Sequence, residues 1–265
     1  MNMDLHGIVC ELEPVVREAG LAALSLQTHL GKVRYKSPKD VVTAADLESE
    51  RILVGELRKR FPEHAVRTEE AGKVSAGSSG APCWFVDPVD GTVNFSRGLP
   101  MWGVSAALVE GGVPLAAICF LPRLGEMFLA TKGGGAFMNG LKISVSETSE
   151  LGHAIVSNGD FNVGQVEKIN PQNLRNFSRE AEACMRVKCM GSAVAEGCFL
   201  AAGRLDGFVM TMSYPWDIAG VALIVREAGG MATDISGSEL KFEDLEPALF
   251  SNGLLHEALL GTLNG

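Results

Sequence analysis

The 265-residue sequence predicts an α+β fold, because helical and strand patterns dominate different stretches of the chain. Near the N-terminus, apolar residues recur at spacings of three and four, which is typical of an amphipathic helix. From residue 83 to residue 130 the pattern changes to short apolar segments separated by turns, which indicates strands. Beyond about residue 145, strand and helix patterns alternate. We therefore predict two sub-domains, residues 1–145 and residues 146–265.

Two helices are predicted in the first third of the chain. The first contains residues 8–30 and ends at Gly31, and the second contains residues 46–60 and stops at a proline. Between them, a polar segment contains Pro38, which argues against helix. Residues 72–82 are rich in glycine, serine and alanine and therefore predict a surface loop.

The rest of the chain is predicted to form strands and helices in turn. Of the four strands predicted between residues 83 and 130, two are joined by a Gly-Gly turn, which indicates a hairpin. The later predicted strands are 154–158, 207–210 and 248–252, and the later predicted helices are 171–184, 193–202 and 218–228.

Composition excludes several classes of function. The net charge of −9 argues against nonspecific binding to nucleic acid or to anionic membranes. The sequence has neither an apolar run long enough to span a membrane nor the basic flank of a signal peptide. None of the six cysteines forms a CxxC pair, which favours buried thiols in a reducing compartment. We therefore expect a cytoplasmic protein.

The segment WFVDPVDGTVNF, residues 84–95, is the most informative part of the sequence. An apolar strand delivers Asp87 and Asp90, Pro88 stiffens the turn between them, and Gly91 lets the backbone approach a ligand closely. Two carboxylates fixed at a strand end suit a hard cation such as Mg²⁺, which prefers oxygen ligands. The alternative is an ordinary turn, since Asp, Pro and Gly are common turn residues.

Further acidic residues stand in two other motifs. Glu69 and Glu70 lie in RTEEAG, and Asp217 lies in YPWDIAG. Taken alone, the first two are interpreted equally well as a solvated charge pair, and Asp217 as a helix N-cap.

Together these motifs resemble the inositol monophosphatase family of Mg²⁺-dependent, lithium-sensitive phosphatases. The family pattern is a Glu-Glu pair, then D-P-[ILV]-D-G-T, then W-D, then E-A-G-G. In this chain the four parts are Glu69-Glu70, residues 87–92, Trp216-Asp217 and residues 227–230. The weaker stretches GGGAFMNG and ISVS are present as well, and the resemblance extends from about residue 5 to residue 260.

The resemblance implies a layered α-β-α-β-α sandwich of the inositol monophosphatase/fructose-1,6-bisphosphatase type, with the active site between the two halves. It also implies a homodimer. The N-terminal sub-domain would carry most of the metal ligands, and the C-terminal sub-domain would carry substrate contacts and Asp217.

The resemblance also assigns metal ligands. Asp87 would contact two Mg²⁺ ions, and Glu69 with the backbone carbonyl of Val89 would complete the site on the nucleophile side. Asp90 and Asp217 would hold the ion on the leaving-group side.

Catalytic and phosphate-binding roles follow from the same resemblance. Asp46 in VTAAD and Thr92 would pair to orient the attacking water, alongside Glu69, although a helix cap remains an alternative for Asp46. The backbone N–H groups of Gly91 and Thr92 would hold the phosphate. Lys36 and Ser37 would lie in a loop that closes over the metals.

Substrate contacts are predicted in the C-terminal half, at Gly191, Ser192 and Ala193, together with Asp90 and Asp217. Two positions depart from the family pattern. Met210 stands where inositol-specific members carry a glutamate that binds ring hydroxyls, and a thioether cannot replace that carboxylate. Thr68 stands where a glycine is usual.

The sequence therefore predicts a Mg²⁺-dependent hydrolase of small polyol or sugar phosphates, acting on inositol-1-phosphate first. Fructose-1,6-bisphosphatase and histidinol-phosphate phosphatase activity are alternatives on the same core. A non-catalytic role in transcription, through protein partners, is an alternative from another class.

Overall fold

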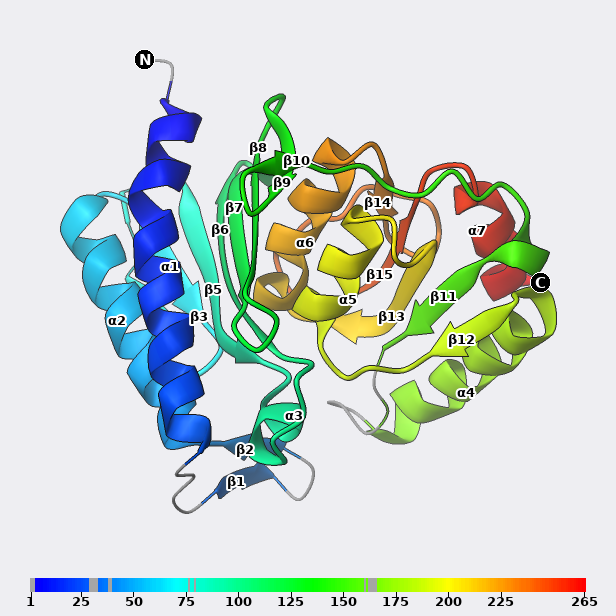
Figure 1. Cartoon of the computed structure of the whole chain (residues 1–265), viewed down its shortest axis with the longest axis horizontal. Helices are drawn as coiled ribbons and strands as arrows, with labels where there is room; N and C mark the ends of the chain where they lie inside the picture. The colour runs from blue at the N-terminus through cyan, green and yellow to red at the C-terminus, as the bar shows by residue number, and fades with distance from the viewer. Residues whose placement is uncertain are drawn as a thin grey trace.

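The computed structural model describes residues 3–28, 33–37, 40–75, 77, 78, 80–159, 161 and 166–265. Helices and sheets alternate in five layers across the long axis of the molecule (Figure 1). The layers follow in this order: two helices, a mostly antiparallel sheet, two further helices, a second sheet and two outer helices. This arrangement confirms the predicted α+β class and the layered α-β-α-β-α sandwich.

The first layer consists of α1 (Leu5–Gln27) and α2 (Ala44–Arg60). Their apolar faces are buried against each other and against the first sheet, in a core that includes Trp84 and Trp102. Helix α1 begins after Asp4, whose carboxylate accepts a hydrogen bond from the Gly7 amide at 3.0 Å.

Among the described residues, eight strands form the first sheet in the order β10-β9-β8-β7-β6-β5-β3-β4. Neighbouring strands are antiparallel except for β3 and β5, which are parallel. The strands are β3 (Ala65–Thr68), β4 (Gly72–Ser75), β5 (Cys83–Asp90), β6 (Gly103–Glu110), β7 (Val113–Leu121), β8 (Glu126–Thr131), β9 (Gly135–Met138) and β10 (Leu141–Lys142).

The second sheet has, in the described part of the chain, five strands in the order β12-β11-β13-β15-β14. Strand β11 is parallel to both of its neighbours, whereas β15 is antiparallel to β13 and β14. The strands are β11 (Ile155–Asn158), β12 (Arg186–Lys188), β13 (Gly207–Ser213), β14 (Met231–Thr233) and β15 (Glu246–Ser251).

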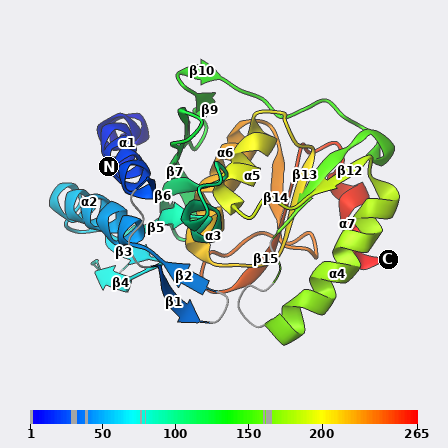
Figure 2. The same cartoon turned by 60° about the horizontal axis from the view of Figure 1, so that its bottom comes forward.

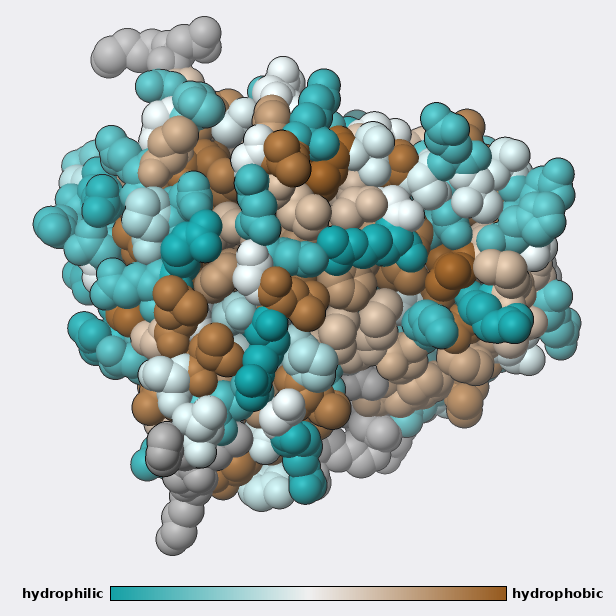
Figure 3. Space-filling model, in the orientation of Figure 1, coloured by the Kyte–Doolittle hydropathy of each residue, from teal (hydrophilic) through white to brown (hydrophobic). Residues whose placement is uncertain are grey.

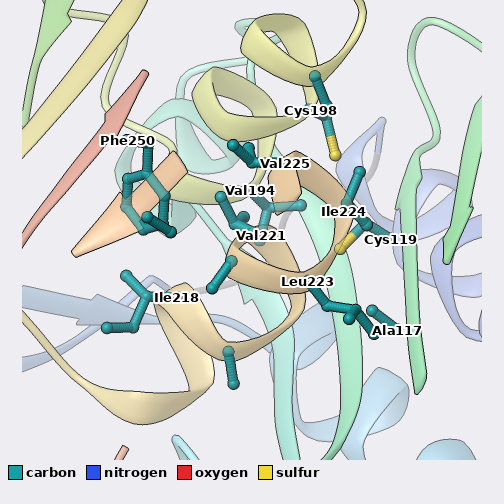
Figure 4. Close-up of a cluster of buried hydrophobic side chains, with 14 of the residues drawn as sticks. Ala117, Cys119, Val194, Cys198, Ile218, Val221, Leu223, Ile224, Val225 and Phe250 are labelled. Atoms are coloured by element: carbon teal, nitrogen blue, oxygen red, sulfur yellow. The ribbon is translucent and has the colours of Figure 1, made fainter. Parts of the chain in front are cut away.

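The middle layer, α5 (Ala193–Ala201) and α6 (Pro215–Glu227), joins the two sheets. Both helices are mostly apolar, and together they pack on β6 and β7 on one side and on β13 and β15 on the other. Figure 4 shows Val194 and Cys198 of α5, Val221 of α6, Cys119 of β7 and Phe250 of β15 in one cluster. The two halves therefore share one hydrophobic core, and their description as two sub-domains stays a proposal.

Two helices cover the outer face of the second sheet, namely α4 (Val166–Ala183) and α7 (His256–Asn264). A short hairpin of β1 (Arg34–Ser37) and β2 (Asp40–Val42) lies near α3 (Thr92–Ser96), at the end of the first sheet where β5 finishes (Figure 2). A short 3₁₀ turn, Leu151–His153, precedes β11.

Several elements differ from their predicted form. Residues 72–75 form β4 instead of a loop, because they pair with the preceding strand β3, a pairing that composition alone does not reveal. The hairpin β1–β2, the strands β9, β10, β12 and β14, and helix α7 were not predicted. Helix α1 ends at Gln27, and the predicted end at Gly31 and the predicted break at Pro38 lie outside the described residues.

No helix within the described residues is both long and apolar enough to cross a membrane. On the face in Figure 3, hydrophobic side chains are interspersed with hydrophilic ones over most of the surface.

Candidate active site

Asp87 and Asp90 lie in the irregular, turn-like last part of strand β5, where it ends. Its pairing with β6 shifts register between these two residues, and such an irregularity re-aims side chains. Both carboxylates are buried, with exposed fractions of 2% for Asp87 and 8% for Asp90. The Val89 amide donates to Asp87 Oδ1 at 3.1 Å, and the Ser49 hydroxyl of α2 donates to the Pro88 carbonyl at 2.8 Å. The turn is thus held both by its own backbone and by α2.

Gly91 follows this turn with a φ of +83°, a left-handed conformation that favours glycine. A Cβ atom here would lie 3.0 Å from the carbonyl oxygens of both Met101 and Gly191. The backbone at Gly91 therefore lies close to protein carbonyls, one of them from a segment of the C-terminal half, and its approach to a ligand stays a prediction. We call that segment, residues 190–194, the strap.

Asp46 and Thr92, which the sequence predicts as a pair, are in contact. Thr92 Oγ1 lies 3.1 Å from Asp46 Oδ1 and 2.9 Å from the Val89 carbonyl oxygen. Asp46 Oδ2 accepts hydrogen bonds from the amide and the hydroxyl of Thr43, which begins α2. Asp46 thus completes the capping box of α2 with one oxygen and meets Thr92 with the other, while the role of this pair in orienting water stays a prediction.

Glu69 and Glu70 follow β3. This strand runs parallel to β5, so the C-terminal ends of both strands lie on the same side of the sheet. Lys36 of β1 places its ammonium 2.9 Å from Glu69 Oε1 and 2.5 Å from Glu70 Oε1. The side chain of Glu70 is 7% exposed. The alternative of a solvated charge pair is therefore wrong for Glu70.

Asp217 lies in the first turn of α6 and is not the N-cap residue. Its Oδ2 accepts a hydrogen bond from the Tyr214 amide at 2.7 Å, which satisfies one of the unpaired donors of the helix start. The side-chain rings of Tyr214 and Trp216 stack beside it, with centroids 4.7 Å apart.

The strap binds Asp90 directly. Asp90 accepts hydrogen bonds from the Ser192 hydroxyl, from the Ala193 amide at 3.2 Å and from the Val194 amide at 2.8 Å. Ser192 and Ala193, predicted as substrate contacts, thus bind a predicted metal ligand. Their contact with a substrate stays a prediction.

Asn94 of α3 makes a second link to the strap. Its Nδ2 lies 2.7 Å from the Met101 carbonyl oxygen, 2.6 Å from that of Met190 and 3.3 Å from that of Gly191. Neighbouring residues of the β5–α3 segment thus contact the C-terminal half at two points.

The carboxylates perturb one another. Burial raises the pKa of Asp87 well above its ordinary value, and the nearby charges of Glu69, Asp90 and Asp217 raise it further. Burial, with the charges of Asp90 and Glu69, also raises the pKa of Asp217 well above its usual range. The pKa of Asp90 rises to about 6, mainly through burial, although its hydrogen bonds from the strap oppose the shift. Acids from three segments of the chain therefore share one electrostatic neighbourhood.

This donor set fits a hard divalent cation. Six carboxylates act on one another here, those of Asp46, Glu69, Glu70, Asp87, Asp90 and Asp217. Lys36 balances part of their charge through Glu69 and Glu70. A cation among them would relieve the repulsion that raises the pKa of Asp87 and Asp217. In the described ranges, however, no three His, Cys, Asp or Glu side chains are already arranged to ligate one ion. The acids are nevertheless near enough to repel one another.

The structure shows the surroundings of Thr68 and Met210, the two residues that depart from the family pattern. Thr68 is fully buried, and its Oγ1 accepts a hydrogen bond from the Ala71 amide at 3.2 Å, which closes the turn that carries the two glutamates. Met210 is half-buried on β13 and packs against the core shared by the two sheets.

Sequence reasoning missed two residues that organise the site, Asn94 and Glu196. Glu196 is 1% exposed, lies in α5 and accepts hydrogen bonds from the strap. A detectable signal existed in the segment AVAEGCFLA, where one acid interrupts an apolar helix. No feature of the sequence distinguished Asn94 from an asparagine in an ordinary turn.

Comparison with known proteins gives a consistent result. A family model described as the inositol monophosphatase family matches residues 8–264. A fructose-1,6-bisphosphatase/inositol-1-monophosphatase of Thermotoga maritima is 37% identical over 246 residues, covering 90% of each chain. A Nus factor SuhB of Pasteurella multocida is 36% identical, covering 76% of this chain and 74% of its own. The solved structure of a Thermotoga maritima IMPase superposes with a TM-score of 0.84 at 35% identity, covering 95% of this chain and 94% of that one.

Proposed function

The chain belongs to the inositol monophosphatase family and is a hydrolase of phosphate monoesters, and we propose that it uses Mg²⁺ to hydrolyse small polyol or sugar phosphates, inositol-1-phosphate first. The observation that carries the metal proposal is the convergence of mutually repelling carboxylates, of which Asp87 and Asp90 are buried. Glu69, Asp87, Asp90 and Asp217, with the Val89 carbonyl, are the proposed ligands.

When bound, Mg²⁺ would supply Lewis acidity at the phosphoryl group and at the attacking water. The chain's own residues would position the other reactants. Asp46 would hold the Thr92 hydroxyl so that this pair accepts a proton from water, since Thr92 Oγ1 and Asp46 Oδ1 are in hydrogen-bond contact. The amides of Gly91 and Thr92 would hold the phosphate.

The substrate class rests on the family and on Met210. A relative named for both fructose-1,6-bisphosphatase and inositol-1-monophosphatase supports polyol and sugar phosphates together. A thioether cannot accept the strong hydrogen bonds that a carboxylate accepts from ring hydroxyls. We therefore propose a range of small phosphate monoesters in place of strict selectivity for inositol-1-phosphate.

A phosphate-release screen tests this proposal. Purified protein with Mg²⁺ is expected to release phosphate from inositol-1-phosphate and fructose-1,6-bisphosphate, with histidinol phosphate and a nucleotide monophosphate as comparison substrates. Excess chelator should abolish release, added Mg²⁺ should restore it, and Li⁺ should inhibit it. Turnover that persists in chelator, or no release from any ester, would contradict the proposal.

A non-catalytic role stays open as a second candidate, because relatives named Nus factor SuhB match this chain at 36% identity. Asp90→Asn separates the two roles. It is expected to abolish phosphate release and to leave any binding to transcription proteins intact. If the variant loses both, the catalytic site and the binding surface are not independent.

Two further expectations remain proposals, a homodimer and a cytoplasmic location. Sedimentation of the purified protein at micromolar concentration tests the first, and a single monomer-sized species would contradict it.

A further inference from the structure

Two buried glutamates flank the end of β11, one on each face of the second sheet. Glu180 of α4 lies on the outer face, where Asn158 Nδ2 donates to its Oε2 at 2.9 Å. Glu196 of α5 lies on the inner face, where the Ser157 hydroxyl donates to its Oε1. Their exposed fractions are 0% and 1%. The two acids therefore have comparable burial but face different neighbours.

Both oxygens of Glu196 also bind the strap. The Met190 amide donates to Oε1 at 3.1 Å, and the Ser192 amide donates to Oε2 at 3.3 Å. Together with Ser157, three donors from two segments meet one carboxylate. Glu196 thus ties the strap to the end of β11.

Ser192 connects Glu196 to the acid cluster. Its amide donates to Glu196, and its hydroxyl donates to Asp90. The Ala195 amide donates to the same hydroxyl oxygen at 3.2 Å, which leaves the hydroxyl proton directed at Asp90. The next two amides of the strap, those of Ala193 and Val194, also donate to Asp90. The position of the strap therefore sets the direction of the Asp90 carboxylate.

We propose that Glu196 is a positioning residue that holds the strap in register, so that Asp90 presents its remaining lone pairs to a divalent cation. The cation in this proposal rests on the proposed function, whereas the positioning of the strap does not. Outer partners that orient ligating carboxylates typically contribute a factor of about 10–100 to metal affinity or activity.

Glutamine cannot reproduce this arrangement. Its side chain has one acceptor oxygen and one donor NH₂ group, whereas Glu196 meets three donors with two acceptor oxygens. In Glu196→Gln, an NH₂ group would face an N–H or O–H donor, and the strap would lose at least one hydrogen bond. The shape and volume of the side chain stay nearly the same, so the change isolates the hydrogen bonds.

The test measures Mg²⁺ binding by isothermal titration calorimetry and, on metal-free protein, amide hydrogen exchange of peptides covering residues 188–198. For Glu196→Gln we expect a Kd for Mg²⁺ that is higher by about 10–100-fold. We also expect a kcat near that of the wild type at saturating Mg²⁺, and faster exchange in the strap. Ser157→Ala removes one donor and leaves the carboxylate, so a smaller change in the same direction is expected even if Glu196→Gln folds poorly.

Glu180→Gln is the matched control, since it neutralises an equally buried acid on the opposite face of the same sheet. It should leave both the Kd for Mg²⁺ and exchange in the strap unchanged. An unchanged Kd in Glu196→Gln, or an equal rise in Glu180→Gln, would overturn the inference, as would unchanged exchange in the strap. Absence of Mg²⁺ binding in the wild type would instead overturn the proposed function, and the exchange measurement would still decide whether Glu196 positions the strap.

Discussion

The two sheets contribute to the acid cluster in different ways. The first sheet places Asp87 and Asp90 at the end of β5, where ladder hydrogen bonds with β6 fix the backbone. The second half contributes through helix starts, with the strap before α5 and Asp217 in the first turn of α6. Strand pairing therefore fixes the backbone of Asp87 and Asp90, whereas the second half contributes hydrogen bonds from the strap to the Asp90 carboxylate. Substitution of the acids on the first sheet should alter the chemistry, and substitutions that loosen the strap should alter the affinity for Mg²⁺.

The largest expected effect comes from Asp87→Asn, which removes the acid on which the charges of Glu69, Asp90 and Asp217 all act. Loss of a metal ligand should lower kcat/KM for phosphate release by on the order of 100-fold or more. In chelator the variant should be more stable than the wild type, because a buried repelling charge is gone. Phosphate release and thermal unfolding with and without Mg²⁺ measure both effects. Activity within a few-fold of wild type would remove Asp87 from the metal site.

Glu180, on the outer face of the second sheet, should affect stability alone. Burial raises its pKa from 4.5 to about 7, so the folded protein binds this proton more tightly than the unfolded chain. That stabilisation is fully present below pH 4.5 and is lost as the pH rises toward 7. Urea unfolding across this range should show the wild type losing up to roughly 3 kcal/mol relative to Glu180→Gln. A constant difference between the two proteins would contradict the shifted pKa.

The link through Asn94 should have a smaller effect. Asn94→Ala leaves the carbonyls of Met190 and Gly191 without this donor, at a cost of about 2 kcal/mol in the free energy of unfolding. The Kd for Mg²⁺ should rise as well, because the strap that orients Asp90 is less constrained. Urea unfolding and calorimetry measure the two quantities. An unchanged Kd would show that the strap is held without Asn94.

The sequence predicted the elements whose signals are local. Helices α2, α5 and α6 and strands β5 to β8 have apolar periodicity or glycine turns within their own residues, and their positions agree with prediction to within a few residues. Strand β4 pairs with β3 just before it, whereas strands β12 and β14 have three partner pairs each and gain their hydrogen bonds only from more distant segments. Their formation depends on tertiary pairing, which no window of sequence contains.

The same division applies to the site. The motif acids and the pairing of Asp46 with Thr92 were predictable because each belongs to a recognisable segment. Glu196 was not, because its role arises only when β11, the strap and α5 come together. The sequence also did not reveal that the Ser192 hydroxyl donates to Asp90. This hydrogen bond joins residues that are 102 positions apart.

The central claim is that acids from separate segments hold divalent cations beside the phosphoryl group. A crystal structure with Mn²⁺ and inorganic phosphate, measured for anomalous scattering, tests it most directly. The account predicts anomalous peaks bounded by the carboxylates of Glu69, Asp87, Asp90 and Asp217, with phosphate next to Gly91 and Thr92. Crystals that contain Mn²⁺ elsewhere but show no peak within ligating distance of Asp87 and Asp90 would contradict it.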